Sequence, residues 1–430
     1  MIKLKNNSSR FFYGWIIVAV SFMSLFFSLG VRVSFGVYYV AILYEFEWTR
    51  ADTAGAFSLA MCVHALISPL SGYLIDRFDP RKFFPAGAAF LAAGLIACSF
   101  ISSIWHLYLF FGVITAIGIN MTGFAPNMTI VPRWFSKNKG LASGLALSGI
   151  GAGSFVVATG VGYIIKMAGW RNAFLITAAT VCIILIPAAA VFLRRSPDEI
   201  GLLPDNEKSS EIKNTPTEID NTNKQISDST NTVWTLGMAM KTSPFWWVVL
   251  TGTCHGFMVN MMIVHEAVYI VDSGFSHLLA ASILGVTTGL SSVGNTLFGG
   301  LSDHIGRKFS LTIGAFIAFS GMMFLLFLKT HPSSMFLYTF TVLYGTGQGA
   351  YTAIYASSMA DLFAGPSLGK IMAVLSVGYG LGGALSSYTG GYLFDITGSY
   401  VIPFISLMFA ICLGSFGIWM ASPEKVKKQY

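Results

Sequence analysis

Four ionisable side chains stand within stretches of sequence that are otherwise apolar or small. Arg32 interrupts SLGVRVSFGVYY, His64 interrupts SLAMCVHALISPLSG, and His265 and Glu266 interrupt MMIVHEAVYIVDSGFS. A guanidinium can hold a carboxylate through two parallel hydrogen bonds. An imidazole changes its charge near neutral pH, so it can take up and release a proton. The chemistry indicated is anion binding and proton transfer.

The elements that position these residues are predicted to be helices crossing a lipid bilayer. The chain has 430 residues, of which 54% are hydrophobic and 10% charged. Soluble domains carry about 25% charged residues, so this chain cannot cover a water-facing surface. Its apolar runs of about 20 residues or more are long enough to span the hydrocarbon core. The five cysteines all lie in such runs without metal or disulfide spacing, which predicts that they are core residues.

Twelve apolar runs predict an all-α membrane protein with twelve transmembrane helices. Their limits are 12–40, 51–75, 83–103, 105–131, 140–165, 171–193, 245–270, 278–301, 309–328, 335–362, 370–394 and 400–421. The polar stretch after the sixth run has almost no large apolar residue and predicts a loosely held linker. We therefore expect an N-terminal six-helix half over 1–194, a cytoplasmic linker over 195–241 and a C-terminal six-helix half over 242–430.

The basic residues indicate how the chain is oriented. If the N-terminus is cytoplasmic, only Arg50, Lys166, Arg171 and Lys329 of the 26 Lys and Arg residues fall in outer segments, and Arg32 falls within a helix. Cytoplasmic loops are enriched in Lys and Arg. We therefore expect a multi-pass protein of the cytoplasmic (inner) membrane with both termini inside. These loops also account for the formal net charge of +7, so no nucleic-acid partner is expected.

An internal repeat relates the two predicted halves. GYLIDRFDPRK at 72–82 matches GGLSDHIGRK at 299–308, which makes Asp76 and Asp303 equivalent positions. The segments 133–153 and 361–383 match at nearly the same offset, which pairs Phe135 with Phe363. Two matched helical halves joined by a central linker are typical of transporters whose substrate site lies near the midplane between the halves.

At these residues the chain resembles the major facilitator superfamily, whose loop motif is G-x-L-x-D-R-x-G-R-K. The matching positions are Gly72, Leu74, Asp76, Arg77, Arg81 and Lys82 in the first copy, and Gly299, Leu301, Asp303, Gly306, Arg307 and Lys308 in the second. The first copy departs from the motif at Asp79–Pro80. The motif implies a tight cytoplasmic turn whose aspartate caps a helix or pairs across the halves, while its arginines hold the helix ends.

A narrower resemblance concerns the predicted fifth helix. WFSKNKGLASGLALSGIGAG is similar to a pattern of monocarboxylate porters and oxalate:formate antiporters, and GWRNAF at 169–174 also fits that group. This implies a carrier for small carboxylates, coupled to a proton or to counter-transport. Relatives grip the carboxylate with a helix-8 arginine, where this chain has Asn295. A lysine on helix 1 of these porters aligns with Val33, one residue from Arg32.

Arg32, His64 and Glu266 each have a functional and a structural interpretation. Arg32 could bind a carboxylate, or it could extend to the membrane interface or pair with Glu45 or Asp52. We favour binding because Arg32 lies well before the outer end of its run. His64 could bind the coupled proton, although a neutral histidine hydrogen-bonded between helices is the commoner arrangement. Glu266 could be a protonatable gate residue, but we favour a solvated carboxylate near the outer mouth.

Further polar and aromatic residues lie on the predicted fourth, eighth, tenth and eleventh helices. Relatives contact substrate through a helix-4 aromatic two residues before a proline, which corresponds to Phe124, and Tyr351 is its repeat-related position. Each tyrosine could instead pack with a single hydrogen bond. Together with Arg32, the predicted substrate-binding residues are Asn120, Phe124, Asn295, Tyr351, Tyr355 and Tyr379.

Several classes of function find no support in the sequence. The glycine-rich stretches follow no predicted strand and precede no phosphate-binding lysine, so they indicate close helix packing. We therefore expect no enzyme, no metal and no cofactor. The expected function is secondary transport of a small organic anion, a monocarboxylate rather than a dicarboxylate, by symport or antiport in a functional monomer. The alternatives are transport of a neutral or amphiphilic metabolite, and a transporter-like sensor.

Overall fold

The computed structural model describes residues 12–136, 138–204, 234–363 and 368–421. Most of the predicted linker, residues 205–233, lies outside the described residues, and so does the Asp76 side chain. The described residues form helices joined by short loops. No strand occurs among them, as expected for an all-α membrane protein.

The first part of the chain forms the N-terminal helix group. Its helices begin near the predicted runs, but the fourth run is divided into short helical pieces. The elements are α1 (Gly14–Phe46), α2 (Arg50–Arg77), α3 (Pro80–Cys98), α4 (Ile104–Leu107), the π-helix η1 (Tyr108–Thr115), α5 (Ala116–Thr122), α6 (Phe124–Ile130), α7 (Lys139–Thr180), η3 (Val181–Leu185) and α8 (Ile186–Phe192).

The second part of the chain forms the C-terminal helix group, which contains six long helices. Its elements are the short α10 (Leu236–Met240), α11 (Ser243–Asp272), α12 (His277–Ile305), α13 (Arg307–Phe327), α14 (Ser334–Leu362), α15 (Leu368–Thr397) and α16 (Val401–Met420).

The described helices account for all twelve predicted spans. Nine described stretches are long and apolar enough to cross a membrane. One of them, 139–192, contains two predicted spans because Gly169, at φ +83°, interrupts the helical backbone. α14 and α15, with 29 and 30 residues, are the remaining two. The twelve-helix prediction is therefore confirmed, with helix 5 and helix 6 joined through Gly169.

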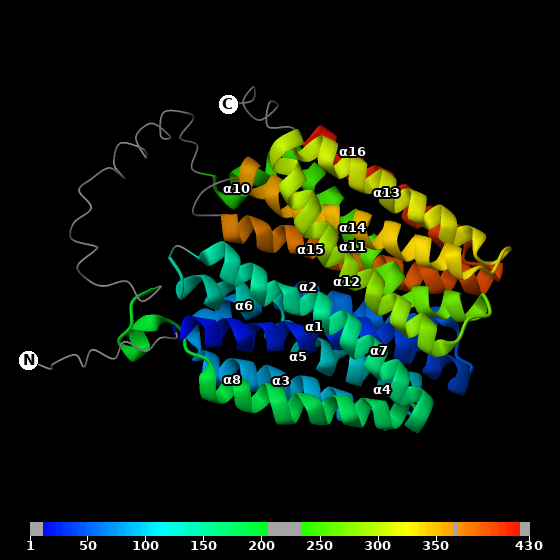
Figure 1. Ribbon diagram of the computed structural model, residues 1–430, viewed down its shortest axis with the longest axis horizontal. Coiled ribbons are helices and arrows are strands. Elements are labelled where there is room, and N and C mark those ends of the chain that lie inside the picture. Colours follow the sequence, from blue (N-terminus) through cyan, green and yellow to red (C-terminus); the bar gives the residue numbers. More distant parts are fainter. Residues whose placement is uncertain (1–11, 137, 205–233, 364–367, 422–430) are drawn as a thin grey trace, which may run out of the picture.

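The two helix groups lie side by side. Figure 1 shows the N-terminal group, coloured blue to green, below the C-terminal group, coloured green to red. Helix pairs that join the groups are α1 with α11, α1 with α12, α2 with α15, and α7 with α12. The domain boundaries 1–194, 195–241 and 242–430 themselves stay a prediction.

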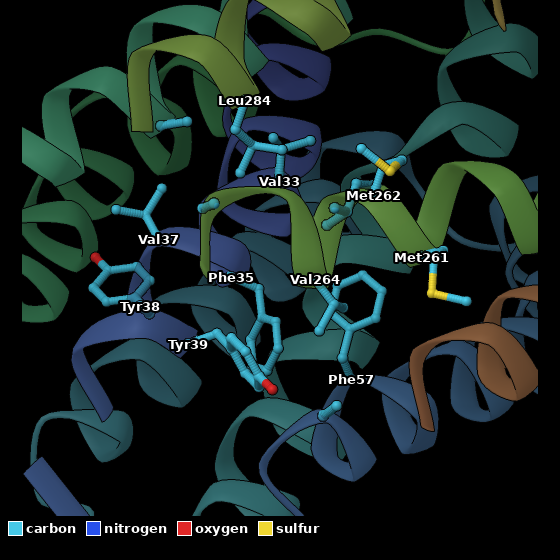
Figure 2. Close-up of a cluster of buried hydrophobic side chains, with 14 of the residues drawn as sticks. Val33, Phe35, Val37, Tyr38, Tyr39, Phe57, Met261, Met262, Val264 and Leu284 are labelled. Carbon is cyan, nitrogen blue, oxygen red and sulfur yellow. The ribbon is translucent and has the colours of Figure 1, made fainter. Parts of the chain in front are cut away.

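An apolar cluster fills the space where α1, α2, α11 and α12 meet. Figure 2 shows Val33 and Phe35 of α1, Phe57 of α2, Val264 of α11 and Leu284 of α12 within it. A side chain at Gly36 would not fit, because an added Cβ would lie 2.0 Å from the Ile263 carbonyl oxygen of α11. This close approach of α1 and α11 joins the two groups just beyond Arg32.

Candidate functional site

Arg32 lies on α1 at the contact between the two groups and is only 7% exposed. Its Nη2 donates to Asn260 Oδ1 of α11 at 2.7 Å and lies 3.3 Å from the Tyr379 hydroxyl of α15. The Met61 sulfur of α2 is 3.2 Å from the same nitrogen, and Nε is buried without a hydrogen-bond partner in the part of the chain that the structure describes. Both groups therefore supply neighbours to one guanidinium.

Those neighbours are all neutral. Among the described residues, Arg32 forms an ion pair with no carboxylate. Glu45 pairs instead with Arg171 at 2.6 Å, and the Asp52 carboxylate accepts from Thr49. The structural interpretations of Arg32, extension to the membrane interface and pairing with Glu45 or Asp52, are therefore both wrong. A buried cation without a counter-charge is unstable unless something compensates it.

His64 of α2 lies beside Arg32, and the two side chains line one small cavity. Asn120 of α5 connects His64 to Ser71: the Asn120 Nδ2 lies 3.1 Å from His64 Nδ1, while its Oδ1 accepts from the Ser71 hydroxyl. This arrangement makes Nδ1 of His64 an acceptor and leaves Nε2 to hold the proton of the neutral ring. The predicted residues Arg32, His64 and Asn120 are thus brought together.

A second histidine, His255 of α11, lies on the C-terminal side of the same site. Its ring lies 5.3 Å from that of Tyr379 and 6.1 Å from that of Tyr351, and its Nε2 is 3.3 Å from the Thr352 hydroxyl. Thr352 is exposed although it contacts the buried His255. We did not predict His255 or Asn260 from the sequence. The signal available for Asn260 was its separation from Arg32, which equals the offset of the internal repeat.

The remaining predicted residues take different positions. The Tyr351 ring is fully buried, and its hydroxyl donates to the Ile411 backbone oxygen. Tyr355 is half-buried and packs against Gly252 of α11, whereas Phe124 is 55% exposed. Asn295 is half-buried, and its backbone lies close to Gly349 of α14. The binding roles of Phe124, Tyr351, Tyr355 and Asn295 stay predictions.

Glu266 is fully buried, so the favoured interpretation as a solvated carboxylate was wrong. α11 continues to Asp272, which places Glu266 well inside the helix. Its Oε1 accepts from the Thr287 hydroxyl of α12 at 2.8 Å, and its Oε2 is buried without a partner. Among the described residues no cation pairs with it. An ionised carboxylate is costly to bury in such surroundings.

One end of the bundle is closed by charged contacts between the groups. We call this the Arg50 end. Arg50 pairs with Asp272 of α11 at 2.7 Å, and its guanidinium lies 3.7 Å from the ring centroid of Phe394. The Asp395 carboxylate of α15 accepts from the backbone N–H groups of Arg50 and Ala51, at the start of α2. Three segments from both groups are thereby tied together.

The opposite end, the Arg307 end, contains the repeated loop motif. Arg307 donates to Asp303 at 2.7 Å and to Asp361 at 3.1 Å, so this pairing stays within the C-terminal group. Gly306, at φ +85°, provides the turn between α12 and α13. Among the described residues, no ion pair at this end crosses between the groups.

The described contacts of the first copy of the motif also stay within one group. Asp79, where the motif usually has another residue, accepts from the Arg81 backbone N–H and caps α3, whose first residue is Pro80. The Arg81 Nε donates to the Leu193 carbonyl, and the Arg77 guanidinium lies 4.5 Å from the Tyr73 ring centroid. Capping here comes from Asp79 and not from a motif aspartate: Asp303 pairs with Arg307 of its own group, and the Asp76 side chain lies outside the described residues. Gly72 has open space beside it, and nothing described assigns it a contact.

A bundle of membrane-length helices in two groups, with polar residues from both groups at its centre, is typical of membrane transporters. Comparison with known families supports this class. The family model described as Major Facilitator Superfamily matches residues 16–386 and 291–429. The chain therefore belongs to the major facilitator superfamily. It is a multi-pass membrane transporter of small molecules and not an enzyme.

Curated relatives match nearly the whole chain at low identity. Monocarboxylate transporter 13 of Bos taurus is 27% identical over 420 residues, covering 96% of this chain and 90% of that protein. Monocarboxylate transporter 12 of Rattus norvegicus is 26% identical over 425 residues, covering 97% and 87%. Monocarboxylate transporter 2 of Homo sapiens is 26% identical over 418 residues, covering 95% and 84%.

Solved structures confirm the fold alone. The crystal structure of D-xylose-proton symporter matches with a TM-score of 0.71 at 16% identity, covering 95% of this chain and 97% of that one. A bacterial homologue of the human lysosomal transporter Spinster, in an inward-facing and unoccupied conformation, matches with a TM-score of 0.64 at 16% identity, covering 95% and 93%.

Proposed function

We propose that this protein transports a small organic monoanion, a monocarboxylate, by alternating access, and that Arg32 binds the carboxylate. The observation behind this proposal is the guanidinium of Arg32, buried between the groups with only neutral neighbours and with Nε unpartnered. Arginine is well suited to a carboxylate because its fork of donors matches the two oxygens. The names of the curated relatives, monocarboxylate transporters 13, 12 and 2, support the same class of substrate.

The charge at the site favours a monoanion over a dianion. Arg32 is a single fixed positive charge, and Asn295 stands where related carriers have an arginine. Two buried cations would be needed to balance a dicarboxylate. We propose that His255, Tyr379 and Asn120 contribute hydrogen bonds around the bound anion, while Phe124, Tyr355 and Asn295 remain further candidates for contact.

Alternating access requires that one end of the bundle opens while the other closes. The contacts among Arg50, Asp272 and Asp395 close the Arg50 end, whereas the pairs of Arg307 stay within one group. We propose that the Arg50 end faces outward and the Arg307 end faces the cytoplasm, with both termini inside and the protein in the cytoplasmic membrane. The arrangement described is then inward-facing.

The driving force is proposed to be a proton or an exchanged anion. His64 and Glu266 are the candidate proton-binding groups. His64 lies next to Arg32, so a proton there would repel the guanidinium and strengthen the attraction for an anion. Glu266 is buried, no described cation pairs with it, and its carboxyl group is the second candidate to bind the proton. The protein is proposed to work as a monomer, because both helix groups needed for the site lie in one chain.

Uptake by purified protein in liposomes tests the proposal. A panel of labelled monocarboxylates, dicarboxylates and neutral sugars is offered with and without an inward proton gradient. We expect accumulation of a monocarboxylate, with either stimulation by the gradient or stimulation by internal anion. Uptake of a neutral solute in preference to every carboxylate would contradict the proposed function. Binding of a solute without any uptake would favour a sensor instead.

A further inference from the structure

The hydrogen bond between Arg32 and Asn260 joins two positions that the internal repeat makes equivalent. Asn260 follows Arg32 by 228 residues, the offset that also relates Phe135 to Phe363. α1 and α11 are therefore repeat-related helices, and the two side chains meet where these helices come together. One member of this pair is a cation and the other is a neutral amide, so the site is symmetric in position and asymmetric in charge.

The amide of Asn260 has a fixed orientation. Its Nδ2 donates to the Gly256 carbonyl in its own helix at 2.7 Å. Its Oδ1 is then the atom that accepts from Arg32 Nη2 at 2.7 Å. Exchanging the amide oxygen and nitrogen would place two donors against each other, because an arginine has no acceptor. Asn260 is fully buried, so water cannot replace either bond.

Asn260 satisfies one donor of Arg32 without neutralising its charge. A buried charge that lacks a counter-charge is costly even when it is hydrogen-bonded. Nε of Arg32 also lacks an acceptor. A bound anion would supply both the missing counter-charge and an acceptor for Nε. An aspartate of the same shape in place of Asn260 would correct the charge deficit from within the chain.

We propose that Asn260 is the positioning residue that holds Arg32 for the substrate. In the empty transporter its amide oxygen fixes the guanidinium across the contact between α1 and α11, and its neutrality leaves the positive charge for an anion. The choice of amide over carboxylate at this position therefore determines the charge selectivity of the site. This inference rests on the proposed function and names a second residue of the same site.

Two variants of Asn260 separate its positioning of Arg32 from the effect of its neutral charge. Asn260→Asp keeps the shape and the acceptor but adds a negative charge, so we expect anion affinity to fall by at least about 30-fold, as is typical when a buried charge changes partner. Asn260→Ala removes the acceptor but leaves the charge of Arg32, so we expect affinity within about tenfold of the unmodified protein. Affinity is measured on purified protein as thermal stabilisation by acetate, pyruvate and benzoate over a concentration series.

Asn127 of α6 offers a matched control. It is fully buried, and its Nδ2 donates to the carbonyl four residues earlier, Gly123, at 2.7 Å, as Asn260 does to Gly256. No described contact joins it to Arg32. We expect Asn127→Asp to change thermal stability while leaving the anion affinity within about threefold, because the added acid does not meet the guanidinium.

Four outcomes would overturn the inference. The first is an Asn260→Asp variant that binds anions with unchanged affinity. The second is an equal loss of affinity in Asn260→Asp and Asn260→Ala, since that indicates only a structural role. If Asn260→Asp does not fold, a folded Asn260→Ala variant without any anion response would also contradict it, and a retained response would support it. No anion response in the unmodified protein would contradict the proposed function, and this inference with it.

Discussion

Arg32 and Arg50 both belong to the N-terminal helix group and both reach side chains of the C-terminal group, but their partners differ in charge. Arg50 meets the carboxylate of Asp272 at 2.7 Å, and the start of its helix is capped by Asp395. Arg32 meets the amide of Asn260 and the hydroxyl of Tyr379. A carboxylate of this chain balances the charge of Arg50, whereas no described carboxylate balances the charge of Arg32.

The difference indicates two roles for the same residue type. A cation balanced by carboxylates of the opposite group stabilises contact between the groups and closes one end of the bundle. A buried cation with neutral partners needs an anion from outside to be balanced. The comparison therefore supports the proposals that the Arg50 end closes and that Arg32 binds the ligand, and the following predictions test them in order of expected effect.

The largest effect is expected at Arg32. Arg32→Gln removes the charge while keeping a polar side chain, so kcat/KM for a monocarboxylate should fall by at least about 30-fold, equivalent to about 2 kcal/mol. Arg32→Lys keeps the charge without the fork and should retain part of the activity. Arg50→Gln serves as the control and should leave anion affinity in detergent nearly unchanged. Equal losses of affinity in Arg32→Gln and Arg50→Gln would remove the distinction between the two sites.

A smaller effect is expected from Asp272→Asn at the Arg50 end. The variant replaces the ion pair with a neutral hydrogen bond, so the open form at this end should become about tenfold more populated, equivalent to about 1.4 kcal/mol. A cysteine at Val37, which lines a small cavity between α1, α7, α11 and α12, reports this by its rate of reaction with a membrane-impermeant thiol reagent in a background without the native cysteines.

Glu45→Gln is the matched control for that measurement. The Glu45–Arg171 pair lies within the N-terminal group, and its side chains are 40% and 47% exposed. Exposed pairs contribute little, so the labelling rate should not change. An increase as large as that of Asp272→Asn would mean that any lost charge loosens this end, and the role assigned to Arg50 would be incorrect.

Glu266 resembles Arg32 and differs from Arg50, because no charged group pairs with it among the described residues. If it binds the transported proton, Glu266→Gln should lose accumulation driven by a proton gradient but keep exchange of internal for external anion. Thr287→Val removes the hydrogen-bond donor and leaves the carboxyl group, so gradient-driven uptake should persist. His64→Asn tests the other candidate proton-binding group in the same way. Full gradient-driven accumulation in Glu266→Gln would exclude Glu266 as the proton-binding group.

The smallest effect is expected at Tyr351. Its hydroxyl already donates to the Ile411 backbone within the C-terminal group. Tyr351→Phe should therefore lower stability by about 1 kcal/mol and change KM less than about twofold. Tyr379→Phe should raise KM by more, because the Tyr379 hydroxyl contacts Arg32 directly. The comparison of KM values in the same liposome assay checks this order, and a larger rise in Tyr351→Phe would support the predicted binding role of Tyr351.

The sequence allowed the helices to be predicted well because apolar length determines a membrane span. The exceptions have local causes. The break between the fifth and sixth spans is a single residue, Gly169, at positive φ. α1 extends to Phe46 rather than 40 because Ile42 and Leu43 remain buried against other helices. The π-helical turn at Tyr108–Thr115 has no distinct apolar pattern that would predict it.

The site was less predictable because the sequence does not determine the rotation of a helix about its axis. In α11, residues 260–270 are all buried, so no polar face shows which way Glu266 or Asn260 points. Glu266 was expected near the mouth and instead faces Thr287. Arg32 was predicted correctly as a buried cation, because a charge within an apolar run has few places to lie. Predicting its neutral partner, Asn260, would have required both the repeat offset and knowledge of how α1 and α11 pack.

The structure of the protein bound to a transported monocarboxylate is the most direct measurement of the central claim. The account predicts a carboxylate oxygen about 2.8 Å from a guanidinium nitrogen of Arg32, between the two helix groups. It also predicts that Arg50 keeps Asp272 as its partner whenever that end is closed. A carboxylate bound elsewhere, with the contacts of Arg32 to Asn260 and Tyr379 unchanged, would contradict the account.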